Sequence, residues 1–221
     1  MKKNKIMRIA SVLLVAVILT TCAISGTFAK YVTSGSGSDT ARVAKFGVNV
    51  TATGTTFAKE YDTDDGTVRG TIAKSVISSN ADKLVAPGTD GEMVQMTLDG
   101  TPEVAVKVAY DATVALDKWT TTGTDFYFPL VIKVNGTPVD FSTAANATDV
   151  KTAIEDAIEA YTINYAPNTD LSTVDTDSLA ITWEWPFEGE NAKDTILGKN
   201  AADGDAATIS LAVTTTVTQI D

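Results

Sequence analysis

The sequence predicts an all-β protein: an antiparallel, jelly-roll-like β-sandwich with one inserted helix at about residues 148–161. Several short runs alternate apolar with polar residues, Gly- and Asp-rich turns separate these runs, and a single stretch has helical spacing instead. We expect three parts: a cleaved signal peptide at residues 1–29, a flexible N-terminal arm at 30–39 and the sandwich domain at 40–221.

The first 29 residues have the pattern of an export signal. Four basic residues precede an apolar stretch at residues 9–24, and Thr27-Phe28-Ala29 then places small residues at the −3 and −1 positions of a signal-peptidase site. Cleavage is therefore predicted between Ala29 and Lys30. We expect the mature protein to be secreted and to lie in the extracellular matrix or at the cell surface. A retained membrane anchor is disfavoured because the apolar core is short for a span and no stop-transfer cluster follows it.

Composition limits the chemistry of the mature chain. Cys22 is the only cysteine and lies within the signal. Lipidation of Cys22 is a minor alternative to cleavage after Ala29, because Thr21 is larger than the residue that usually precedes a lipidated cysteine. Removal of residues 1–29 takes away four positive charges and leaves 13 Lys and Arg against 28 Asp and Glu, a net charge of −15. Because nucleic acid and anionic membranes attract positive surfaces, we expect neither as a partner after cleavage.

The predicted arm and first strand follow the cleavage site. The arm opens with Lys30, Tyr31, Val32 and Thr33 and continues as a flexible Ser/Gly run. Residues 41–52 are expected to form a strand that is buried on one side, because their apolar residues alternate; this face comprises Ala44, Phe46, Val48 and Val50.

The middle of the chain contains weaker and stronger strand patterns. A short strand is possible at residues 57–61, and residues 68–77 remain unassigned. Residues 92–98 alternate Val94, Met96 and Leu98 with more polar positions, and residues 104–114 alternate in the same way after a Gly-Thr-Pro turn. We expect these last two strands to pair with each other.

The second half begins with an alternating run at residues 126–134, which Asn135-Gly136 follows as a type I′ hairpin signal. Apolar residues then recur at helical spacing, which predicts a helix capped by Thr148 or Asn146 and packed against a sheet edge or end; they are Val150, Ile154, Ile158 and Tyr161. Two late strands are predicted at residues 179–185 and 207–217.

Catalysis is not expected. The chain has no histidine, and the mature chain has no cysteine, so a Ser-His-Asp or Cys-His mechanism has no base or nucleophile. Carboxylate pairs could support glycoside chemistry, and Trp183 and Trp185 could stack on sugars. Alternate tryptophans in one strand share a face, however, which favours a role in the core.

No organic cofactor is expected. Calcium is the one metal ion for which the sequence offers candidate ligands. The acidic turn at residues 62–66 offers hard oxygen ligands from Asp62, Asp64 and Asp65. The alternative is that these residues only form a turn, because Asp and Gly favour turns without a metal.

Several segments resemble one family of exported proteins. Thr27-Phe28-Ala29 followed by Asp39-Thr40-Ala41-Arg42-Val43-Ala44-Lys45-Phe46-Gly47-Val48 is similar to the start of TasA and camelysin-like proteins, SipW-dependent biofilm-matrix fibre proteins of Gram-positive bacteria. Weaker similarity extends over the Pro87-Gly88 turn, the segments at residues 183–188 and 194–198, and the closing strand that ends at Asp221.

The resemblance implies a structural subunit that polymerises with itself outside the cell. A SipW-type signal peptidase would release the arm, the arm would add as a strand to the next subunit, and an accessory matrix protein is a further candidate partner. Camelysin-like relatives are described as metalloproteases, but this chain lacks a His-Glu-x-x-His motif. The alternative function is a monomeric secreted adhesin or ligand-binding β-sandwich.

Overall fold

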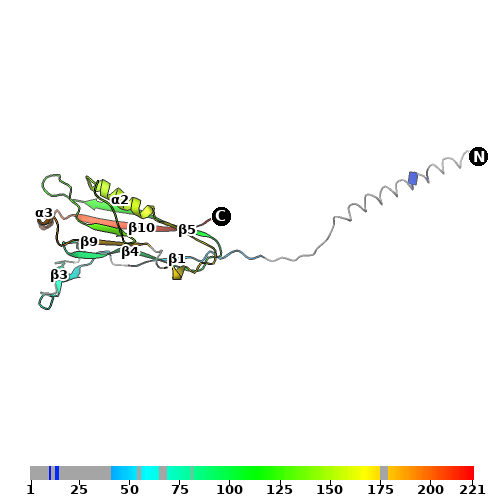
Figure 1. Ribbon diagram of the computed structural model, residues 1–221, viewed down its shortest axis with the longest axis horizontal. Helices are drawn as coiled ribbons and strands as arrows, with labels where there is room; N and C mark the ends of the chain where they lie inside the picture. The colour runs from blue at the N-terminus through cyan, green and yellow to red at the C-terminus, as the bar shows by residue number, and fades with distance from the viewer. Residues whose placement is uncertain are drawn as a thin grey trace, which may run out of the picture. The chain divides into compact units, whose positions relative to one another are not determined.

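Two antiparallel sheets face each other across an apolar core in the computed structural model of the protein (Figure 1). The structure describes Ala10, Leu13 and Leu14 and residues 41–53, 56–64, 69–80, 82–174 and 179–221. Residues from Ala44 to Asp221 form one compact unit, which contains every element described below, and residues 1–43 form a separate one.

The larger sheet has five strands, in the order β1 (Asn49–Thr53), β4 (Thr89–Asp99), β9 (Ala180–Trp185), β6 (Val131–Val134) and β7 (Thr137–Pro138). The smaller sheet has three, in the order β10 (Thr208–Gln219), β5 (Val106–Asp117) and β8 (Thr162–Tyr165). The remaining elements are the hairpin of β2 (Glu60–Asp62) and β3 (Lys74–Ile77), the helices α2 (Ala147–Glu159) and α3 (Asn191–Ala202), and the 3₁₀ turn η1 (Leu171–Thr173).

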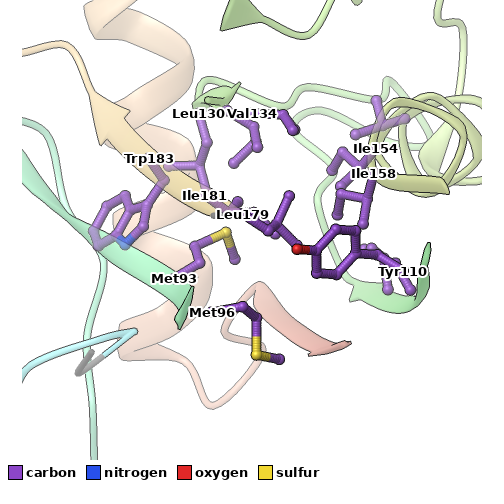
Figure 2. Close-up of a cluster of buried hydrophobic side chains, with 14 of the residues drawn as sticks. Met93, Met96, Tyr110, Leu130, Val134, Ile154, Ile158, Leu179, Ile181 and Trp183 are labelled. Carbon is purple, nitrogen blue, oxygen red and sulfur yellow. The ribbon is translucent and has the colours of Figure 1, made fainter. Parts of the chain in front are cut away.

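Alternating residues of β5 and β9 form the centre of the core. Val106, Val108 and Tyr110 of β5 are at most 2% exposed, and Ile181 and Trp183 of β9 are equally buried. Figure 2 shows Tyr110 between the side chains of α2 and those of β9 and its flanking residue Leu179. The predicted class, an antiparallel β-sandwich with an inserted helix, is confirmed, and Trp183 and Trp185 are core residues as expected.

Helix α2 matches its prediction closely. Val150, Ile154 and Ile158 are buried against the sheets, and the structure selects Asn146 as the N-cap, since its side-chain oxygen accepts the Asp149 N–H at 3.1 Å. We expect Asn146→Ala to lower the free energy of unfolding by about 1 kcal/mol, because a first-turn N–H loses its acceptor. Chemical denaturation would measure this, with Thr148→Ala as the control, and equal losses in both variants would contradict the assignment of the cap.

The first predicted strand is largely wrong. Only residues 49–53 are a strand, all five are exposed, and Phe46 remains 42% exposed. Gly47 has a positive φ of +24°, which interrupts the extended backbone before β1, and Lys45 instead exchanges hydrogen bonds with Glu103. The alternation is present in the sequence, but β1 lies at the edge of the larger sheet, and Val48 is the one residue of the predicted face that packs against the core.

The expected pairing of residues 92–98 with 104–114 is also wrong. The first segment lies in β4 and pairs with β1 and β9, whereas the second lies in β5 and pairs with β10 and β8. Residues 100–105 thus carry the chain from one sheet to the other. A β-bulge between Glu92 and Val94 further shifts the alternation in β4, so that Met93 is buried and Val94 only half-buried.

Two further differences concern the second half of the chain. The alternating run at residues 126–134 is a strand only from Val131, since Pro129 lacks the N–H that a ladder requires. The type I′ turn that follows is confirmed by positive φ angles of 46° at Asn135 and 78° at Gly136. Helix α3 was not predicted, because its apolar residues do not recur on one face and Leu197 is its only buried residue.

Candidate assembly edge

The longest unpaired strand edge among the described residues is the outer side of β10. This strand pairs with β5 in an unbroken register of 12 residue pairs, from Thr208 opposite Asp117 to Gln219 opposite Val106. Among the described residues, no strand pairs with its other side. A full row of β10 backbone groups is therefore available to an incoming strand.

The side chains of β10 show that this side of the core is incompletely covered. Five residues point inward and are only half-buried: Ile209, Leu211, Val213, Thr215 and Val217. The corresponding face of neighbouring β5 is almost fully buried from Val106 to Val114. Since the two strands share one sheet, the difference arises because β10 has a neighbour on one side only.

β10 also lacks the features that usually protect an edge. It contains no charged residue, proline or bulge over its length, and its outward face is rich in Thr and Ser. The other edge strands of the described residues are short: β1 has five residues, β8 has four, and β7 has two, one of which is Pro138.

The opposite edge of the smaller sheet is formed by the short strand β8. β8 pairs only with residues 106–109 of β5, and α2 packs against β5. The Glu155 carboxylate of α2 accepts the backbone N–H of Val114 at 2.8 Å, which satisfies a donor that a neighbouring strand would otherwise take. Figure 1 shows α2 beside β5, with β10 running along β5 as well. Among the described residues, the smaller sheet therefore offers its longest unpaired row of backbone groups at β10.

A largely apolar cavity of about 520 Å³ opens where β10 begins. Its walls include the indoles of Trp119 and Trp185, residues of α3 and the loop at residues 82–87, and Thr208 and Ile209 of β10 also line it. The indole N–H of Trp119 donates to the Thr208 carbonyl at 2.7 Å, and this bond ties the cavity wall to the first residue of the strand. The cavity therefore reaches the first two residues of the edge strand.

The rim of this cavity carries charge. Asp82, Lys83 and Asp194 line it, and the Asp194 carboxylate accepts the Tyr127 hydroxyl at 2.9 Å. Burial, reinforced by the bond to Asp194, raises the pKa of Tyr127 well above its usual value, so Tyr127 remains a hydrogen-bond donor at neutral pH.

Two of the three calcium candidates, Asp62 and Asp64, line a second, acidic hollow of about 460 Å³ beside the β2–β3 hairpin. The Lys74 ammonium contacts the Asp62 carboxylate at 2.7 Å and Glu60 at 3.1 Å, and this contact lowers the pKa of Asp62. Asp64 lies 3.5 Å from Arg69, and Asp65 lies outside the described residues. Within the described ranges, no three acidic side chains come together in a way that could hold a metal ion.

The other predicted site residues lie outside what the structure describes. These are the cleavage pair Ala29 and Lys30 and the arm residues Lys30, Tyr31, Val32 and Thr33. Sequence reasoning did not single out the β10 edge or the cavity as sites, although it predicted β10 as a strand. An uncharged, proline-free run of 12 strand residues is equally typical of a central strand, so no signal in the sequence identified the edge.

Among the helices of the described residues, none combines the length and apolar character that crossing a bilayer requires. Comparison of the chain with family models and with curated proteins finds no significant match to either.

Proposed function

We propose that the protein is a secreted structural subunit that assembles into extracellular fibres without catalytic activity. In this proposal the N-terminal arm of one subunit, beginning at Lys30, adds as a strand to β10 of the next. The observation that carries the proposal is the open edge of β10, which is 12 residues long and has half-buried apolar side chains. An added strand would form hydrogen bonds with the unpaired backbone groups of β10. It would also cover the half-buried side chains.

The dimensions of arm and edge are compatible. Ten residues from Lys30 to Asp39 span about 33 Å when extended, and the 12 residues of β10 span about 40 Å. Each subunit would offer one arm and one edge, so the contact is head-to-tail. A repeated head-to-tail contact that does not close into a ring generates a filament.

Export would control when assembly begins. Signal cleavage after Ala29 by a SipW-type peptidase would free the arm only outside the membrane, so subunits would not polymerise in the cytoplasm. The partner is then a second copy of the chain, with an accessory matrix protein as a possible initiator, and neither nucleic acid nor membrane is required after cleavage.

A monomeric ligand-binding sandwich is the second candidate function, and the cavity between Trp119 and Trp185 is the observation that favours it. The two functions differ in their dependence on the arm. A monomeric binder needs no arm, whereas a strand-exchange fibre cannot form without one.

We expect the chain that starts at Lys30 to form fibres and the chain that starts at Thr40 to remain monomeric. The physical reason is that both variants keep the whole buried core, which lies within residues 44–221, and differ only in the donated segment. Electron microscopy and sedimentation velocity would measure the difference. Fibres from both chains would contradict donation by the arm, and monomers from both would favour the ligand-binding alternative.

A further inference from the structure

We propose that the cavity at the start of β10 is an anchor pocket for the side chain of Tyr31 from the arm of a neighbouring subunit. This inference rests on the proposed function and adds to it the point of attachment, the anchoring residue and the direction of the arm. It is carried by Thr208 and Ile209, which both line the cavity and begin the edge strand β10.

The chemistry of the cavity fits a tyrosine. Its walls are mostly apolar and include Trp119, Trp185 and Leu197, while Asp82, Lys83 and Asp194 at the rim can meet a hydroxyl. Tyrosine combines a large apolar ring with one polar end, and it suits a pocket with a dry interior and a wet rim. The cavity volume of about 520 Å³ lies within the range of sites that accept small organic groups.

The composition of the arm leaves one candidate for this role. Tyr31 is the only aromatic residue between Lys30 and Asp39, and the residues from Ser34 onward are small and polar. Lys30 precedes it and would carry two positive charges after cleavage, one on its α-amino group and one on its side chain. The carboxylates of Asp82 and Asp194 at the rim complement these charges.

The placement of the anchor determines the direction of the arm. The cavity lies at Thr208, the first residue of β10, and Tyr31 is the second residue of the mature chain. An arm anchored there and lying along the edge therefore runs parallel to β10. Val32 and Thr33 would begin the strand, and the Ser/Gly run would continue toward Gln219.

The test uses a synthetic peptide of residues 30–39 with a free N-terminus and a fluorophore on its last residue. Its binding to the chain that starts at Thr40 would be followed by fluorescence anisotropy. We expect Tyr31→Ser in the peptide to weaken binding by at least about tenfold, because the ring is no longer buried, and Tyr31→Phe to retain affinity within about threefold.

The matching change in the receptor is Gly198→Leu. Gly198 lines the cavity from α3, and a Cβ at this position would meet no atom within 4 Å, so a larger side chain can occupy the cavity without a backbone clash. Leu also favours helix over Gly, which keeps α3 folded. The control is Ala202→Leu, an exposed position of α3 that does not line the cavity.

We expect Gly198→Leu to weaken peptide binding by at least about tenfold and Ala202→Leu to leave it within about threefold of the unmodified chain. Equal affinity of the Tyr31→Ser and unmodified peptides, equal binding by the Gly198→Leu and Ala202→Leu chains, or no peptide binding at all would overturn the inference.

Fibre formation separates this inference from the proposed function. Fibres that form normally from chains carrying Tyr31→Ser or Gly198→Leu would overturn the anchor and leave strand donation intact. Tyr31-dependent peptide binding with no fibres from the chain that starts at Lys30 would support the anchor and contradict the fibre.

Discussion

Val213→Lys is expected to abolish fibre formation by the chain that starts at Lys30 while the sandwich stays folded. Val213 points inward from the middle of β10 and is half-buried, opposite Ala112 of β5. In the free subunit a lysine there can extend its ammonium past the open edge into water, because no strand of the described ranges lies beyond it. A donated strand would close that route and enclose the charge.

The expected size of this effect follows from desolvation. Enclosing an unpaired ammonium costs several kcal/mol, and each 1.4 kcal/mol changes an association constant tenfold. The concentration needed for assembly should therefore rise at least about 100-fold, as measured by sedimentation of fibres across a concentration series. The folded subunit should lose only about 1 kcal/mol, since a half-buried valine contributes little more than that.

Thr214→Lys is the matched control for this experiment. Thr214 neighbours Val213 but points to solvent, and it lies opposite Asp111 of β5, so a lysine there gains an acidic neighbour. We expect this variant to form fibres like the unmodified chain. Fibres from Val213→Lys at unchanged concentration would show that β10 does not accept the arm.

Trp183→Ala is expected to cause the largest loss of stability, about 3–5 kcal/mol in the free energy of unfolding. The indole is 2% exposed, packs against Phe57 with ring centroids 5.3 Å apart, and donates its N–H to the Thr56 carbonyl at 2.7 Å. Its removal would leave both a large cavity in the sandwich and a carbonyl without its donor. The segment at residues 56–61 would lose its main attachment to β9.

Chemical denaturation at equilibrium would measure this loss, with Phe187→Ala as the control. Phe187 follows the same strand but is 71% exposed, so its truncation should change stability by less than about 0.5 kcal/mol. A loss below about 1 kcal/mol for Trp183→Ala would contradict the central role of this residue in the core.

The strongest sequence predictions were those in which a local pattern decides the structure. Alternation identified the buried residues of β9 and β5, helical spacing identified the buried face of α2, and Asn135-Gly136 specified its turn. Each of these depends on residues within one element, because the period of a strand or a helix determines which side chains share a face.

Predictions that depended on distant residues were weaker. Alternation in residues 92–98 and 104–114 showed two strands but not their partners, since each strand can pair with any other that lies beside it. The bulge at Glu92 to Val94 depends on the fit to β9 across the sheet. Helix α3 has no apolar face to detect, because it buries only Leu197.

The sequence by itself determined the β-sandwich class, the buried faces of β5 and β9, the helix with its buried face and the absence of histidine. Only the tertiary structure decided that β10 lies at an edge, that Glu155 of α2 accepts the Val114 N–H of β5 and that a cavity opens beside Thr208. The physical reason is that alternation specifies which side of a strand is buried, whereas an edge and a cavity depend on which other segments lie next to it.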